Sequence, residues 1–412
     1  MVERRLLAAL ALPSLALAFA LTIVSSYVPV LLDQFTSSEM LVGILLGLEG
    51  GCALVLPLLV GAWSDRTKSR LGPRLPFVIG STFLGALALL VLAVGSSLAA
   101  IAIGLFVFYG AYFTYFSPYL ALCPDLVDGA GQARTQSGLA IARMLGMGSA
   151  LVAGGALLAL SRPAPFVLAA VLLCAMTWIL VAVTHRDARA IPAQKVSGRA
   201  LLGAWEIVRG DAHIRRLVVA TELWELALAA IKSFAVLFVV VGLGRSLGFT
   251  PIVMGLVAGG VVLAAFAAAP LAERYGEVRV LAAAAALYGG GLLLPAFTRE
   301  ISFVLPSLPL FAFGAGLVMT VAYAAILRAL PADRRGAATG LLGFGRGVGL
   351  VLGPVLAGMA IQVLGPWFAD TRGYAAIWLV AAVAVLLSLG PVARLLRDEQ
   401  QAAATPAAAP AL

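Results

Sequence analysis

The chain has 412 residues, of which 62% are hydrophobic and 11% are charged, and its mean hydropathy is +1.05. A soluble domain carries about 25% charged residues and could not bury this much apolar surface, so the composition excludes an ordinary soluble protein. The net charge of +9 does not indicate nucleic-acid binding, because the basic residues gather in particular loops between apolar runs.

Twelve apolar runs are long enough to cross a bilayer as helices, which need about 17–25 residues. The first six runs lie at 6–32, 39–63, 77–95, 99–121, 135–160 and 165–184. The second six lie at 214–243, 251–271, 280–298, 303–328, 337–364 and 374–393. We therefore predict four parts, namely an N-terminal six-helix bundle at 1–184, a cytoplasmic linker at 185–213, a C-terminal six-helix bundle at 214–396 and a disordered tail at 397–412.

The first run follows Arg4 and Arg5, but it is longer than the apolar core of a signal peptide and predicts a membrane helix. With both termini placed in the cytoplasm, cytoplasmic segments hold 21 of the 28 Lys and Arg residues and periplasmic loops hold four. This asymmetry follows the positive-inside rule. It predicts a multi-pass protein of a bacterial-type inner (plasma) membrane with both termini in the cytoplasm.

Two charged features recur at an offset near half the chain length. Ser64-Asp65-Arg66 follows the second run, and Glu273-Arg274 follows the eighth, 208 positions later. Arg143 precedes a glycine-rich stretch in the fifth run, and Arg346 does so in the eleventh, 203 positions later. These offsets predict an internal duplication, which is common in transporter folds.

Two segments carry a family resemblance. Residues 61–77 read GAWSDRTKSRLGPRLPF, and 117–143 contain Ser117-Pro118-Tyr119 and Pro124-Asp125-Leu126 before Arg134-Thr135. Both segments resemble the major facilitator superfamily, and more specifically its glycoside–pentoside–hexuronide:cation symporters, which include sucrose transporters. The resemblance implies an all-α membrane fold of twelve helices in two pseudo-symmetric six-helix bundles. It also implies a gating motif formed by Gly61, Asp65, Arg66, Arg70, Gly72, Arg74, Asp125 and Arg134.

Asp65 has a predicted role within this motif. It ends a predicted helix, where a carboxylate can face the positive N-terminus of a neighbouring helix. The resemblance makes that neighbour the helix that starts near Ala337, so the contact would form in one conformation and break in the other. A generic basic loop is the alternative interpretation, and it explains Lys68, Arg70 and Arg74 but not Asp65.

Six ionisable residues fall inside predicted spans, where each costs at least about 2.5–3.5 kcal/mol unless it has a partner or faces water. They are Glu49, Arg143, Glu222, Glu225, Lys232 and Arg346. Glu49 lies about ten residues into its run, which is near mid-bilayer at 1.5 Å per residue. Glu222, Glu225 and Lys232 are spaced to share one helix face, and the resemblance directs that face toward the central cavity.

These charges have a functional interpretation and a structural one. In the first, a carboxylate binds the coupled proton, with Glu225 as leading candidate, Glu49 as second and Glu222 as third. Arg143, Arg346 and Lys232 would then bind substrate. In the second, the charges form static ion pairs, such as Glu225–Lys232 and Glu49–Arg346. Glu222, nearest the cytoplasmic end, is then expected to be solvated.

Aromatic residues add a hint of a sugar substrate. Tyr109, Tyr112, Phe116 and Tyr119 recur at helical spacing and form a stripe that could stack on sugar faces, or simply pack between helices. Tyr27 and Trp224 are further candidates for substrate contact.

The family pattern fails at two places. The resemblance to plant sucrose symporters predicts an aspartate where this chain has Tyr109, and sodium-coupled relatives have carboxylates before the proline that corresponds to Pro57. The chain has none there, so sodium coupling is disfavoured. Proton coupling would require a different residue, and uncoupled transport also stays open. The leading hypothesis is a proton-coupled carrier of a sugar or glycoside that works by alternating access.

Three alternatives remain open, namely an exporter of amphipathic small molecules or lipids, a non-transporting assembly factor, and a membrane enzyme. The enzyme lacks support, because the sequence shows no nucleophile, base or metal-ligand set and no ATP-binding loop. We expect no cofactor and no metal. The expected partners are a small-molecule substrate, the proton and the bilayer, without nucleic acid. A monomer suffices, since one chain contains both halves.

Overall fold

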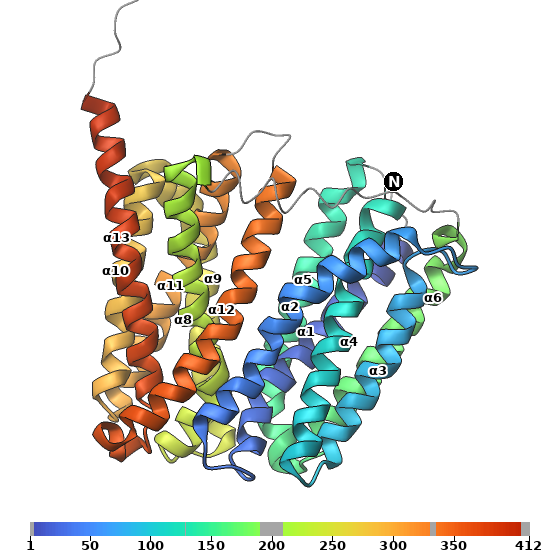
Figure 1. The fold of residues 1–412 in the computed structure, drawn as a ribbon, viewed down its shortest axis with the longest axis horizontal. Helices are drawn as coiled ribbons and strands as arrows, with labels where there is room; N and C mark the ends of the chain where they lie inside the picture. Colours follow the sequence, from blue (N-terminus) through green and yellow to red (C-terminus); the bar gives the residue numbers. More distant parts are fainter. Residues whose placement is uncertain (1–3, 128, 190–208, 330–334, 405–412) are drawn as a thin grey trace, which may run out of the picture. The chain divides into compact units, whose positions relative to one another are not determined.

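The computed structural model describes residues 4–127, 129–189, 209–329 and 335–404, and these residues form helices without any strand (Figure 1). Within them, twelve helical segments are long and apolar enough to cross a membrane. The predicted all-α fold with twelve spans is therefore confirmed.

The helices follow the predicted apolar runs closely. In the first part of the chain they are α1 (Arg4–Leu32), α2 (Glu39–Arg66), α3 (Leu75–Val94), α4 (Leu98–Leu126), α5 (Gly129–Leu160) and α6 (Ala164–Ala188). In the second they are α8 (Ala212–Leu237), η1 (Phe238–Gly242), η2 (Leu247–Phe249), α9 (Thr250–Tyr275), α10 (Glu277–Phe297), α11 (Ile301–Ala329), α12 (Arg335–Leu364), η4 (Gly365–Thr371) and α13 (Ala376–Ala404). Ser38 and Ser97 cap α2 and α4 by accepting a backbone N–H, as polar residues do at helix starts.

The chain divides into two compact units. The first contains Met1–Gly198, Ala230–Gly255 and Leu350–Tyr374, and the second contains Arg199–Ala229, Leu256–Gly349 and Ala375–Leu412. Three helices, α8, α9 and α12, therefore contribute one part to each unit.

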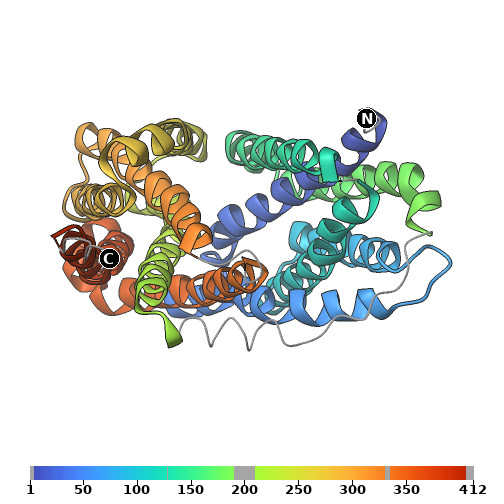
Figure 2. The same ribbon diagram turned by 90° about the horizontal axis from the view of Figure 1, so that it is seen from above.

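In the first unit, α1 packs against α5 and α6, while α3 packs against α4 and α6 (Figures 1 and 2). Small residues allow the close approach of these helices. A Cβ at Gly146 of α5 would overlap the backbone of Leu15 on α1. On α2, a Cβ at Gly43 would overlap the Pro354 carbonyl of α12, and a Cβ at Gly47 would contact the Val351 carbonyl at 3.2 Å.

The second unit repeats this arrangement. Its α10 packs against α11 and α13, just as α3 packs against the fourth and sixth helices of the first half. Gly260 of α9 and Gly316 of α11 bring those two helices together, because a Cβ at Gly260 would meet the Pro309 carbonyl and one at Gly316 would meet Ala264. The recurrence supports the predicted internal duplication.

The C-terminal helix is longer than the sequence predicts. Residues 397–404, expected within a disordered tail, continue α13 as far as Ala404. Ala, Gln, Glu and Arg are strong helix formers, and Asp398 pairs with Arg216 of α8, so the helix extends past its last apolar turn. The predicted linker falls mostly on 190–208, and the end of the predicted tail on 405–412, which both lie outside the described residues.

Candidate functional site

Glu49 and Lys232 form an ion pair inside the first unit. Glu49 lies on α2 and is 7% exposed, and the Lys232 Nζ of α8 lies 3.1 Å from its Oε1 and 3.4 Å from its Oε2. Glu49 is about 15 Å along the axis from the start of α2, so the pair lies deep in a predicted span. The low dielectric there strengthens the attraction and also makes an unpaired charge unfavourable.

Tyr109 of α4 completes this site. Its side chain is fully buried, and its hydroxyl has no hydrogen-bond partner among the described residues. The Glu49 carboxylate and the Cys52 thiol lie close enough to act on it electrostatically. A buried hydroxyl without a partner costs about 1–3 kcal/mol, so the site holds a donor that a ligand or a water molecule could satisfy.

Glu225 and Arg346 form a looser pair in the second unit. Their Oε2 and Nε atoms lie 3.8 Å apart, which is too long for a hydrogen bond. The Arg346 side chain is 66% exposed, whereas that of Glu225 is 17% exposed. Gly349 of α12 lies against the backbone of Glu225, which brings α8 and α12 together at this point.

Glu222 lies one turn before Glu225, and its environment differs from the solvated one expected from the sequence. Both of its carboxylate oxygens are buried and have no hydrogen-bond partner among the described residues, so it is not the solvated residue that the sequence suggested. The cause is Gly345 of α12, whose missing side chain leaves the space that the carboxylate occupies. The buried hydroxyl of Tyr288 on α10 also has no partner in the described part of the chain and lies within electrostatic range of Glu225.

The two ion pairs differ from those suggested by the sequence. The structural interpretation offered Glu225–Lys232 and Glu49–Arg346 as examples of static pairs. In the structure Lys232 pairs with Glu49, and Arg346 pairs with Glu225. Residues seven positions apart on one helix are separated by about 10 Å along its axis, so Glu225 and Lys232 each find a partner on another helix.

Arg74 holds the predicted gating motif together. Its side chain is 10% exposed, and the guanidinium forms ion pairs with Asp65 at the end of α2 and with Asp125 at the end of α4, the latter at 3.1 Å. The same side chain donates a hydrogen bond of 3.1 Å to Ser64. The arginine therefore ties the loop after α2 to the end of α4 within the first unit.

The other motif residues divide into packed and exposed positions. Gly72 has a φ of +84°, and a Cβ there would overlap the Ala188 carbonyl at the end of α6, so only glycine fits. A Cβ at Gly61 would lie 3.1 Å from the Ser117 hydroxyl. The exposed members are Arg66, Arg70 and Arg134. The predicted contact of Asp65 involves Ala337, whose side chain lies outside the described residues.

The aromatic stripe divides into two parts. Tyr112 and Phe116 stack with ring centroids 5.8 Å apart, and the Arg143 guanidinium of α5 lies over Phe116 at 5.7 Å. Tyr119 is fully buried and hydrogen-bonds to Ser14 and to the Leu10 carbonyl of α1. Tyr119 therefore packs helices together, while the Tyr112–Phe116 stack supports an exposed arginine.

Tyr27 and Trp224 also pack between helices. Tyr27 is fully buried and donates to the Leu151 carbonyl at 2.9 Å. Trp224 is fully buried and its Nε1 donates to Ser388 of α13 at 2.7 Å. In this conformation neither side chain presents a surface to a substrate.

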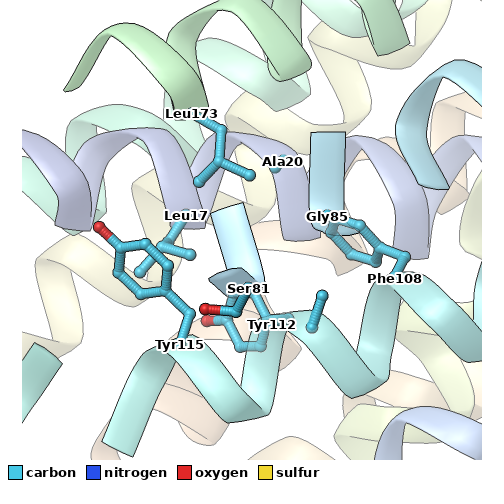
Figure 3. A pocket seen from close by; sticks show the side chains of 9 residues that line it. Leu17, Ala20, Ser81, Gly85, Phe108, Tyr112, Tyr115 and Leu173 are labelled. Atoms are coloured by element: carbon cyan, nitrogen blue, oxygen red, sulfur yellow. The ribbon is translucent and has the colours of Figure 1, made fainter. Parts of the chain in front are cut away.

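A small cavity lies within the first unit, bounded by α1, α3, α4 and α6 (Figure 3). Its surface is almost wholly apolar, and Leu17, Leu173 and Tyr112 are among the residues that line it. Its volume of about 10 Å³ has room for about one water molecule. It is too small for a substrate.

A third polar cluster was not predicted from the sequence. The Tyr374 hydroxyl, before α13, lies 3.1 Å from Asp33 Oδ1 and 2.8 Å from Glu39 Oε1. Burial and the two carboxylates raise the pKa of Tyr374 well above its ordinary value. Little in the sequence predicts this cluster, because the three residues lie at the ends of different apolar runs and carry no motif.

Known proteins resemble this chain in sequence and in fold. The Major Facilitator Superfamily model matches residues 10–244 and again residues 226–411. The uncharacterized MFS-type transporter YfiU of Bacillus subtilis (strain 168) is 33% identical over 97 residues, which span 24% of this chain and only 19% of that protein.

The structural neighbours share the fold at low sequence identity. A bacterial homolog of the human lysosomal transporter Spinster, in an inward-facing and unoccupied conformation, has a TM-score of 0.79 at 13% identity and covers 97% of this chain and 99% of that one. The nucleoside transporter NupG has a TM-score of 0.78 at 17% identity, with 96% and 99% covered. A bacterial homologue of the iron transporter ferroportin, in an inward-facing state, has a TM-score of 0.75 at 16% identity, with 96% and 99% covered. Because the family model matches nearly the whole length, the chain belongs to the Major Facilitator Superfamily.

Proposed function

We propose that this multi-pass transporter is a proton-coupled carrier of a sugar or glycoside that works by alternating access. We place it in a bacterial inner membrane as a monomer with both termini in the cytoplasm. The observation that supports this proposal is the Glu49–Lys232 pair beside the unpartnered Tyr109 hydroxyl, deep in a predicted span.

The coupling follows from what a proton does to this pair. When Glu49 takes up a proton, its negative charge disappears and the attraction to Lys232 is lost. Lys232 and Tyr109 then become hydrogen-bond donors for substrate oxygens. When the substrate leaves, the proton is released and the Glu49 carboxylate pairs with the Lys232 ammonium again. Proton binding and substrate binding therefore depend on the same three side chains.

The second unit supports proton binding through Glu222. An ionised carboxylate with both oxygens buried and no donor would cost several kcal/mol. Glu222 is therefore best interpreted as a neutral acid that holds a proton in this conformation. Sequence alone favoured Glu225 for the coupling role, but its long, exposed contact with Arg346 makes Glu49 the stronger candidate.

The sugar assignment rests on two features. Tyr112 and Phe116 are half-buried aromatic residues of the kind that contact sugar rings. The segments at 61–77 and 117–143 resemble the glycoside–pentoside–hexuronide branch, and Arg74 joins the two segments through Asp65 and Asp125. The lack of carboxylates around Pro57 favours the proton over sodium.

Uptake into liposomes tests the proposal. A panel of labelled sugars and glycosides would be offered with and without a pH gradient that is acidic on the side of the added substrate. We expect at least one compound to accumulate only with the gradient. Glu49→Gln should lose this accumulation but keep exchange of internal for external substrate. The matched control Glu300→Gln removes an exposed carboxylate outside the spans and should behave as wild type.

Two results would contradict this function. Full gradient-driven accumulation by Glu49→Gln would remove Glu49 from the coupling. If no sugar is taken up and cells that produce the protein resist amphipathic compounds, the exporter predicted as an alternative would be favoured.

A further inference from the structure

The charges inside the spans have an asymmetric exposure. The Lys232 side chain is 33% exposed and that of Glu49 is 9% exposed. The Arg346 side chain is 66% exposed, against 17% for Glu225. Arg143 is also exposed, and it pairs with none of the described carboxylates. In each unit the basic side chains are therefore more exposed than the acidic side chains with which they pair.

An exposed cation within a span requires water. A charged side chain that faces hydrocarbon costs at least about 2.5–3.5 kcal/mol, and more where it cannot reach the membrane surface. The exposed parts of the Arg143 and Lys232 side chains therefore face water within the first unit, and the exposed part of Arg346 does so within the second. The first unit thus presents two cations to water.

Arg143 contacts an aromatic ring and no described carboxylate, so its charge is available to an anionic ligand. The Phe116 ring lies 5.7 Å from its guanidinium carbon, and Tyr112 stacks behind Phe116. A ring against the guanidinium face stabilises the cation through its π-electrons and restrains its orientation. The N–H groups along the guanidinium edge stay available, and their fork matches a carboxylate or a phosphate.

We propose that the transported compound carries an anionic group, a carboxylate or a phosphate ester, which Arg143 and Lys232 recognise. This inference rests on the proposed function and narrows its substrate class. Charge balance agrees with it: one proton converts the Glu49 carboxylate to the neutral acid and frees the Lys232 ammonium to neutralise one negative charge of the substrate. A proton and a monoanion would then cross together without net charge transfer.

Charge-selective labelling of an introduced cysteine tests the inference without a known substrate. Met147 lies one turn after Arg143 on the same face of α5 and is 45% exposed. Met147→Cys would be made with Cys52, Cys123 and Cys174 replaced by Ala, and purified protein that elutes as a single species would be used. The cysteine would be labelled with two methanethiosulfonate reagents, one with an anionic ethylsulfonate group and one with a cationic trimethylammonium-ethyl group. The rate with each reagent would be divided by the rate of the same reagent with a free thiol in solution.

We expect the normalised ratio to favour the anionic reagent by about tenfold, because a nearby cation attracts it and repels the other. Arg143→Gln should bring the ratio close to that of a free thiol, and Arg143→Lys should retain most of the preference. A ratio equal to the free-thiol value, a preference for the cationic reagent, or no reaction with either would overturn the inference. Liposome uptake of a neutral sugar with unchanged proton coupling would also contradict the substrate class while leaving the proposed function intact.

Discussion

Arg74 shows how one buried side chain can organise a loop. It neutralises Asp65 and Asp125, which come from the ends of two different helices. We expect Arg74→Gln to leave two carboxylates without their cation and to destabilise the folded protein by about 3–5 kcal/mol. Thermal unfolding in detergent would measure this. Arg70→Gln, in the same loop but exposed, should change stability by no more than about 0.5 kcal/mol, and equal losses in both variants would contradict the assignment.

Tyr374 gives a pH-dependent prediction at the same scale. Removing its hydroxyl in Tyr374→Phe breaks its contacts with Asp33 and Glu39 and should cost about 1.5–3 kcal/mol, the range for a hydrogen bond to a charged group. The matched control Tyr323→Phe alters a tyrosine that is 47% exposed and should have little effect.

The sign of the pH dependence follows from the raised pKa of Tyr374. A group with a higher pKa in the folded state contributes its full stability below the unfolded pKa, which is about 10 for tyrosine, and loses it as the pH rises above that value. The stability difference between wild type and Tyr374→Phe should therefore shrink as the pH rises above about 10. A difference that grows above pH 10 would contradict this.

Sequence predicted which residues are charged inside the membrane but not how they pair. Glu49 and Lys232 stand out in the sequence because a charged side chain within an apolar run is unfavourable in lipid. Their pairing depends on which helix faces bring the two side chains together, and helical spacing on one run does not determine it. The burial of Glu222 was missed for the same reason, because it depends on Gly345 of another helix.

At the scale of the helices, glycines set how closely α2 and α12 approach. A Cβ at Gly43 would overlap the Pro354 carbonyl, which is backbone and cannot rotate away, whereas Gly51 on the same helix has open space. We expect Gly43→Ala to lower the unfolding temperature, with an overpacking cost of about 1–3 kcal/mol. Gly51→Ala should raise it slightly, because alanine favours a helix by about 1 kcal/mol. Equal effects would show that this contact does not limit the packing.

Apolar runs predict the helices well because length and hydropathy decide whether a segment spans a bilayer. The run predicted at 165–184 is the core of α6, Ala164–Ala188, and the run at 39–63 is the core of α2, Glu39–Arg66. The ends differ by several residues, since polar residues can continue a helix beyond the apolar region. Residues 397–404 of α13 were missed for this reason.

At the scale of the whole molecule, the two halves of the chain repeat one fold. The family model matches each half of the chain separately, and α10 repeats the packing of α3. The repeat is conspicuous in sequence only at a few charged and glycine-rich positions, because most apolar residues can replace one another in a membrane helix. Identity to the structural neighbours is 13–17%, so their shared fold does not transfer a substrate to this chain.

Infrared difference spectroscopy of the purified protein is the most direct test of the central claim, that Glu49 takes up the coupled proton. Steps in pH would be applied to wild type, Glu49→Gln and Glu300→Gln, and the absorption of protonated carboxyl groups would be followed. We predict that one component of the carboxyl band, which appears on acidification of wild type and Glu300→Gln, is missing from Glu49→Gln. An unchanged band in Glu49→Gln would contradict the account.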